Sequence, residues 1–158
     1  MPYLSSKDHM AEQCVKKSSQ ALTGGTVADV FTVSGGPVLC LGIFVHITTA
    51  CSANASLIHF EADPTVGAAN TDIAEGAGAP DLQSAAVGDW FYTNGDSQDV
   101  MVKAANGTDL PMMANNNGGI VLPVGGIDMD LSTSDLTTGI ADIFIRYKPL
   151  VAGAKVTT

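Results

Sequence analysis

Strict alternation of apolar side chains makes residues 37–49 the most regular segment of the chain. Every odd position from Leu39 to Ile47 is apolar, whereas the even positions mix apolar and polar residues. A period of two is that of a β-strand, whose successive side chains point to opposite faces. The segment is too short, and too polar at its far end, to cross a bilayer as a helix. We therefore expect a long central strand with one face in the core and the other partly covered.

Shorter segments of the same kind recur at intervals of roughly ten residues, separated by Gly- and Asn-rich turns. No segment has the apolar period of an amphipathic helix, so the pattern predicts an all-β domain, a two-sheet β-sandwich or jelly roll of about seven to nine strands. The strand order cannot be derived from the pattern. The further strands that we expect lie at residues 26–33, 56–62, 71–74, 85–93, 100–104, 119–123, 127–131 and 140–148.

The alternation also predicts how individual strands are oriented. The turn at residues 34–37 predicts that the segments on either side of it pair as a hairpin. Ile58 and Phe60 are expected to face the core, with His59 and Glu61 outside. In the last strand, one face carries Ile143, Ile145 and Tyr147, and the other carries Asp142, Phe144 and Arg146.

Residues 1–25 differ from the rest, and we interpret them as an N-terminal arm that precedes a sandwich domain at residues 26–158. Apolar residues are sparse here, and a short helix over residues 7–17 would be marginal alone. The segment is either a frayed terminus or an arm that orders against a partner. Gly24 and Gly25 mark the hinge. The start has no basic segment followed by an apolar one, so we expect no signal peptide.

Charge and cysteine content restrict the classes of function. The chain has sixteen acidic and seven basic residues, for a net charge of −9. Nucleic acid is therefore not expected as a partner, because phosphate contacts need clustered Lys or Arg. The acidic residues are dispersed, which favours a role in solubility over cation storage. The three cysteines, Cys14, Cys40 and Cys51, form neither an even disulfide framework nor a zinc spacing. This usage is typical of folding in a reducing cytoplasm.

No constellation of residues predicts catalysis. The histidines, His9, His46 and His59, match no nucleophile, metalloprotease or P-loop motif, and we interpret them as surface or interface residues. Asn94, Asp96 and Asp99 share a turn whose oxygens would suit Ca²⁺, although turn chemistry is the preferred explanation. Asp128 and Asp130 share a strand face, as a glycosidase pair would, but a solvated face is the preferred interpretation.

The aromatic run Trp90, Phe91 and Tyr92 contains the single tryptophan of the chain. Neighbours on a strand point to opposite faces, so at least one of the three is expected to be exposed or in a contact.

Two segments of the sequence resemble those of a known class of proteins. Residues 22–37, which run into 42–49, and the closing segment 139–154 resemble small structural proteins of tailed-bacteriophage virions, in particular capsid decoration (cement) proteins. The resemblance covers residues 22–154. It implies a β-sandwich that sits as a homotrimer on the outer capsid surface, is made in the host cytoplasm, and bridges subunits of the major capsid protein lattice. Together with the missing catalytic motifs and the acidic charge, the resemblance leads us to expect no enzyme activity, no cofactor or metal, and no nucleic-acid or membrane partner.

The main hypothesis is therefore a decoration protein whose arm and nearby loops contact the shell. The residues that we expect in shell or subunit contacts are Tyr3, Leu4, Lys16, Lys17, Trp90 and Tyr92. The alternative is a tail- or fibre-associated module that binds host-surface glycans through Trp90, Tyr92 and the Asn-rich loop 115–117. A hydrolase that uses Asp128 and Asp130 is the third and least favoured hypothesis.

Overall fold

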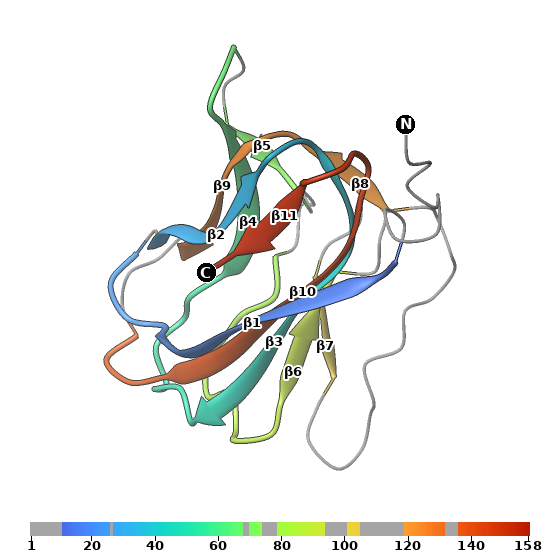
Figure 1. Ribbon diagram of the computed structural model, residues 1–158. Coiled ribbons are helices and arrows are strands. Elements are labelled where there is room, and N and C mark those ends of the chain that lie inside the picture. The colour runs from blue at the N-terminus through green and yellow to red at the C-terminus, as the bar shows by residue number, and fades with distance from the viewer. Residues whose placement is uncertain are drawn as a thin grey trace, which may run out of the picture.

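Two antiparallel sheets lie face to face in the computed structural model (Figure 1). The structure describes residues 11–25, 27–67, 70–73, 79–93, 101–104, 119–131 and 136–158. Sheet A has six strands, and in spatial order these are β1 (Gln13–Ala21), β10 (Ile140–Pro149), β3 (Val38–Thr49), β6 (Trp90–Tyr92) and β7 (Val102–Ala104), with β8 (Ile120–Leu122) also paired to β3. Sheet B has five strands, in the order β11 (Lys155–Thr157), β2 (Val27–Ser34), β9 (Gly125–Leu131), β4 (Ile58–Pro64) and β5 (Thr71–Asp72).

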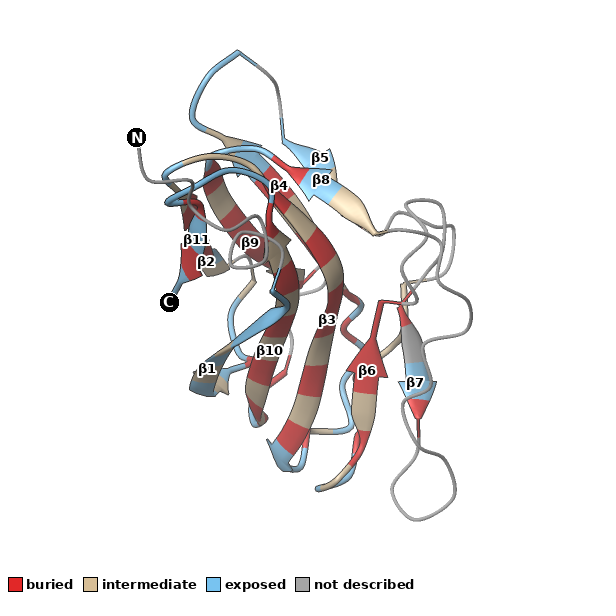
Figure 2. Cartoon of the chain, turned by 45° about the vertical axis from the view of Figure 1, so that its right-hand side comes forward, coloured by how far each residue is buried: buried red, intermediate tan, exposed pale blue. Residues whose placement is uncertain are grey.

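The all-β class and the two-sheet sandwich are confirmed, whereas the finer jelly-roll assignment stays a prediction. The core lies between the sheets, where apolar side chains from both inner faces are fully buried, Val45 and Ile143 from sheet A and Phe60 and Ile127 from sheet B among them. Figure 2 shows the alternation of buried and half-buried positions along β3 and β10. The predicted inward row Ile58 and Phe60 and the two predicted faces of β10 are also confirmed.

The predicted apolar row of β3 is wrong at its first two positions. Arg146 pairs with Gly42 and Tyr147 with Cys40, so Leu41 is an extra residue that forms a β-bulge. An extra residue reverses the alternation, since side chains on a strand have a period of two. Before the bulge the even positions Val38 and Cys40 are therefore buried, and Leu39 lies half-buried on the outer face.

The hairpin predicted at residues 34–37 is also wrong, because β2 and β3 lie in different sheets. β3 pairs with β10 in sheet A, and β2 pairs with β11 in sheet B. The link from β2 to β3 and the link from β10 to β11 therefore pass side by side from one sheet to the other. Gly35 makes this corner possible. Its φ is +73°, and an added Cβ would lie 2.1 Å from the carbonyl oxygen of Gly153, so only glycine fits.

The N-terminal arm does not extend to residue 25, because Gln13–Ala21 forms the edge strand β1 of sheet A. The helix considered for residues 7–17 is excluded from Gln13 onward for the same reason. β10 would otherwise present an unpaired edge, and β1 satisfies its backbone groups. An edge strand needs only a sparse apolar face, which is why the segment lacks a clear period. Tyr3 and Leu4 lie outside the described residues.

Each edge of sheet A carries a lysine on an inward-facing position. Lys17 of β1 is paired with the buried Ile143. Lys103 of β7 is paired with the buried Phe91, and its ammonium lies 3.2 Å from the Asp89 carboxylate. Inward-pointing charges at sheet edges discourage further strands from pairing there.

Candidate interaction surface

Aromatic side chains from three neighbouring strands gather on the outer face of sheet A. Phe44 and Phe144 are cross-strand partners, and so are Phe44 and Tyr92, and His46 and Trp90. Cross-strand partners share a face, so register alone brings these rings together. We call this set the aromatic surface, and it consists of Phe44, His46, Trp90, Tyr92 and Phe144.

The rings of the aromatic surface contact one another. His46 and Trp90 stack with centroids 4.4 Å apart and 25° between their planes. Trp90 and Phe144 are 6.0 Å apart and tilted by 33°, and Phe44 and Tyr92 stack at 6.2 Å. All except Tyr92 remain partly accessible to solvent, and Tyr92 is 7% exposed. Each such pair contributes about 0.5–1.5 kcal/mol beyond burial, so the rings hold a defined arrangement.

Paired charges from β10, β1 and the residue that precedes β1 border the aromatic surface. The Lys16 ammonium lies 2.7 Å from the Asp142 carboxylate and 5.4 Å from the centre of the Phe144 ring. Arg146 Nε donates to Glu12 Oε1 at 2.6 Å. The hydrogen bond from Lys16, followed by one from the Ser19 backbone N–H, lowers the pKa of Asp142 below its ordinary value.

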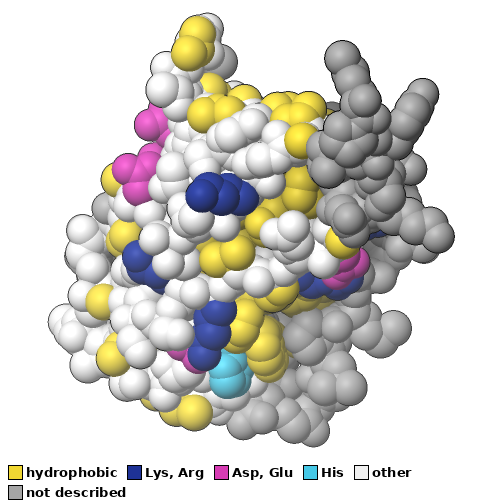
Figure 3. Space-filling view, in the orientation of Figure 1, with side chains coloured by type: hydrophobic (Ala, Val, Ile, Leu, Met, Phe, Trp, Pro, Cys, Tyr) yellow, Lys and Arg dark blue, Asp and Glu magenta, His cyan; other side chains and the backbone are white. Residues whose placement is uncertain are grey.

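The aromatic surface is hollowed where β1, β3, β6 and β10 meet. An open hollow of about 320 Å³ is lined by Cys14, Phe44, Trp90, Phe144 and Arg146. Figure 3 shows hydrophobic side chains gathered in the lower part of this face, next to a histidine and between basic side chains. An aromatic centre with an adjoining arginine and a charged rim is the anatomy of a protein-binding surface.

The structure brings together only some of the residues predicted to make contacts. Lys16, Trp90 and Tyr92 lie together on this face, although Tyr92 is nearly covered. Lys17 points to the opposite side of β1, so it cannot share a flat contact with Lys16. The loops at 94–99 and 115–117, like His9, lie outside the described residues.

Three contributors were missed by the sequence analysis, namely Phe44, Phe144 and Arg146, whereas His46 had been interpreted as a surface or interface residue. The alternation had placed Phe144 and Arg146 on one face of their strand and Phe44 on the mixed face of another. Strand order was the missing information, because only the adjacency of β10, β3 and β6 turns these separate faces into one surface.

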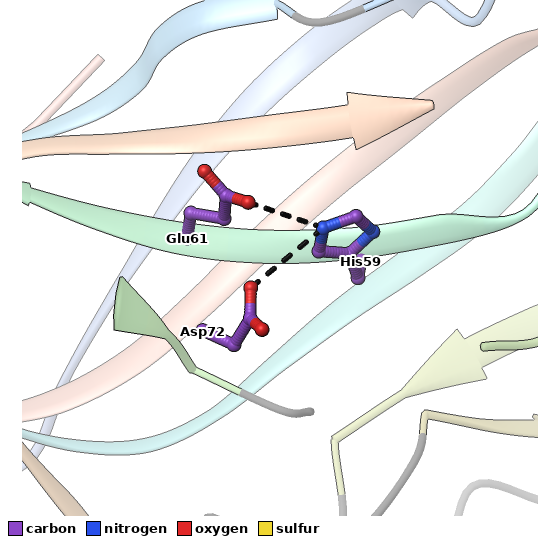
Figure 4. Close-up of side chains that lie close together, drawn as sticks. All are labelled: His59, Glu61 and Asp72. Carbon is purple, nitrogen blue, oxygen red and sulfur yellow. Dashed lines mark hydrogen bonds and ion pairs between the residues drawn. The ribbon is translucent and has the colours of Figure 1, made fainter. Parts of the chain in front are cut away.

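A second cluster of polar side chains occupies the outer face of sheet B. His59 Nε2 lies 3.3 Å from Glu61 Oε1, 3.3 Å from Asp130 Oδ2 and 3.7 Å from Asp72 Oδ1. The potential ligand atoms of His59, Glu61 and Asp72 all lie within 4.8 Å of one another, so these three could hold a metal ion (Figure 4). The alternation of β4 had predicted that His59 and Glu61 face outward, but Asp72 requires the pairing of β5 with β4.

Asp128 and Asp130 share the outer face of β9, opposite Glu61 and His59 of β4, but their environments differ. Asp128 was expected to face water, but it is 7% exposed, because a bulge in β2 places the Asp29 backbone N–H 2.7 Å from its carboxylate. Asp130 contacts His59 instead.

The three cysteines differ in environment, and none forms a disulfide. Cys40 packs in the core, and burial raises its pKa to about 12. Burial also raises the pKa of the Cys51 thiol. Cys14 is exposed at the rim of the hollow. The two buried thiols are therefore poor nucleophiles, and Cys14 is the accessible one.

Two further findings concern membrane-spanning helices and similarity to known proteins. Within the part of the chain that the structure describes, no helix has the length and apolar character needed to cross a membrane. A comparison with protein-family models, with curated proteins and with solved structures found no match of any of the three kinds.

Proposed function

We propose that this chain is a capsid decoration protein of a tailed bacteriophage, which binds the outside of the assembled shell as a homotrimer and bridges capsid subunits. The single observation that carries the proposal is the aromatic surface on the outer face of sheet A, stacked across β10, β3 and β6. It is supported by the sequence resemblance and by the two-sheet sandwich, the fold that the resemblance implies.

The aromatic surface has the composition of a contact centre. Trp, Tyr and Arg are the residues that most often dominate binding energies in protein interfaces. Here Trp90 and Arg146 line the same hollow. The Lys16–Asp142 and Glu12–Arg146 pairs lie at its border, where ion pairs contribute more to orientation than to affinity.

A rigid two-sheet sandwich with one contact surface is suited to stabilising an assembled shell. A protein that binds the assembled lattice, and not the loose subunit, stabilises the assembled form by RT ln(1 + [L]/Kd), about 2.7 kcal/mol at a hundredfold excess over Kd. Three linked copies on a symmetric lattice add avidity, so a modest contact area on each copy is sufficient.

Co-sedimentation tests this proposal. Shells of the phage whose genome carries the coding sequence, purified without this protein, are mixed with the full chain. The wild-type protein should pellet with the shells, whereas Trp90→Ala and Phe144→Ala should bind at least about tenfold more weakly while keeping the wild-type circular dichroism. Val66→Ala removes an apolar side chain that is 86% exposed elsewhere, and it should bind normally. Equal binding of all four proteins, or no binding by any, would refute the proposal.

Binding of host-surface glycans is the second candidate function, because the side chains of Trp90 and Arg146 line the same open hollow. Sugars pack on aromatic rings and accept hydrogen bonds from such neighbours. Glycan-array binding that is lost in Trp90→Ala, together with no affinity for shells, would favour this function over cementing.

A further inference from the structure

We propose that His59, Glu61 and Asp72 form a binding site for a divalent first-row transition-metal ion on the outer face of sheet B. The site lies on the opposite side of the sandwich from the aromatic surface, and the inference does not depend on the proposed function. It rests on a mixed set of donors, one imidazole nitrogen and two carboxylates, that converge on one point (Figure 4).

The distances from His59 to the two carboxylates are close to those between ligands of one metal ion. Charge-assisted N–H···O hydrogen bonds are about 2.7–2.9 Å long. His59 Nε2 is farther than this from both Glu61 Oε1, at 3.3 Å, and Asp72 Oδ1, at 3.7 Å. When metal–ligand bonds are about 2.0–2.2 Å, two ligands of a tetrahedral ion lie about 3.3–3.6 Å apart. The 3.3 Å separation falls in this range and the 3.7 Å separation lies just above it, so both contacts of His59 are closer to the spacing of metal ligands than to that of a tight ion pair.

Backbone pairing fixes the three side chains on one face. Glu61 and Asp72 are directly opposed on β4 and β5. His59 precedes Glu61 by two residues on β4, so it projects from the same face. Strands position ligands more precisely than loops do, since the ladder hydrogen bonds hold their backbone. β4 lies between β9 and β5, so the ligand strand is paired on both sides.

The local charge favours a cation. The side chains of His59, Glu61 and Asp72 are only 20–25% exposed, so water screens the two carboxylates incompletely. Asp130 brings a third carboxylate to within 3.3 Å of the same nitrogen from β9. The Asn70 amide donates to Glu61 Oε2 at 3.4 Å, which leaves Oε1 directed at His59. A bound dication would offset this negative charge, and Asp130 could accept a hydrogen bond from a metal-bound water.

The donor set selects the class of metal. An imidazole nitrogen with carboxylate oxygens suits Zn²⁺, Co²⁺ or Mn²⁺. Ca²⁺ prefers six to eight oxygen ligands, so it should bind poorly at a site with this nitrogen.

Calorimetry with metal salts tests the site in the full chain carrying Cys14→Ser, which removes the exposed thiol as a competing ligand. The protein should bind one equivalent of Zn²⁺. His59→Gln and Asp72→Asn should each weaken this binding by at least about tenfold. Asp63→Asn is the matched control, because Asp63 is the next outward-facing acidic residue on β4, and it should leave the affinity unchanged. In NMR spectra, the ring signals of His59 should shift on Zn²⁺ addition and those of His46 should not.

Three results would overturn the inference. These are the absence of saturable Zn²⁺ binding, equal losses in Asp63→Asn and Asp72→Asn, and binding that His59→Gln leaves intact. Circular dichroism of each variant without metal shows whether it has folded, so a loss of binding can be assigned to the ligand. None of these outcomes depends on whether the protein binds shells, so this inference and the proposed function fail independently.

Discussion

Trp90 and His46 occupy directly opposed positions on β6 and β3, and their rings stack with centroids 4.4 Å apart. The stack holds the indole against the sheet while leaving it partly accessible. This arrangement makes Trp90 an anchor of the aromatic surface and not part of the core.

Neighbouring residues on β6 should therefore respond very differently to truncation. Trp90→Ala should lower the free energy of unfolding by only about 1 kcal/mol, since it removes a surface stack. Phe91→Ala should lower it by about 3–5 kcal/mol, because Phe91 is fully buried and its loss leaves a cavity. Urea unfolding followed by circular dichroism measures both. Similar losses in the two variants would show that Trp90 belongs to the core.

The Lys16–Asp142 pair predicts a pH-dependent stability. The folded-state pKa of Asp142 lies below its ordinary value, so the ionised carboxylate stabilises the fold above about pH 4, and this contribution is lost as the pH falls through the folded-state pKa. Asp142→Asn should cost up to about 1 kcal/mol at pH 7. The difference from wild type should shrink steadily below pH 4 in urea titrations. A difference that stays constant with pH would exclude a contribution from ionisation.

Thiol reactivity should follow burial. In the native protein at pH 8, one thiol should react with a disulfide reagent, and peptide mapping should identify it as Cys14. Cys40 and Cys51 should react only in denaturant, because burial raises both pKa values. Rapid labelling of Cys40 without denaturant would contradict the described packing of β3.

At the corner between the sheets, replacing Gly35 and replacing Gly153 by alanine should lower the stability by unequal amounts. Both have positive φ, +73° at Gly35 and +85° at Gly153. A Cβ on Gly35 would meet the Gly153 carbonyl at 2.1 Å, whereas a Cβ on Gly153 would meet no heavy atom within 4 Å. Gly153→Ala should therefore cost about 1–2 kcal/mol from backbone strain alone, and Gly35→Ala should cost more. Thermal unfolding measures the stability of both variants. Equal losses of stability would contradict the clash between a Cβ on Gly35 and the Gly153 carbonyl oxygen.

The sequence predicted the elements of the fold better than their arrangement. Alternation alone places β3, β4 and β10, because a two-sided strand carries its burial pattern in its own residues. It does not reveal the bulge at Leu41, which depends on the register between β3 and β10. It also misses β1, since an edge strand needs little apolar surface.

Residues of the candidate sites could be predicted only where the pattern of a single strand indicates them. Trp90 and the outward-facing His59 and Glu61 follow from local pattern. Phe144 beside Trp90, and Asp72 beside Glu61, depend on strands that are distant in sequence but adjacent in the sheets. Strand order is set by the packing of the whole core, so no local pattern encodes it.

A truncation that tests the N-terminal segment has to leave β1 in place. Deleting residues 1–20 would remove most of β1, including Gln13, whose side chain accepts a hydrogen bond from the Tyr147 hydroxyl at 2.6 Å. It would thus lower stability as well as test contacts. Deleting residues 1–10 leaves β1 intact, so it should separate a contact role of Tyr3 and Leu4 from folding. A loss of stability in this shorter deletion would contradict that separation.

Cryo-electron microscopy of shells carrying the bound protein tests the central claim most directly. The account predicts density in which the outer face of sheet A lies against the shell, with Trp90, Phe144 and Cys14 enclosed in the contact, and sheet B faces solvent. Density that leaves the aromatic surface open to solvent would contradict it.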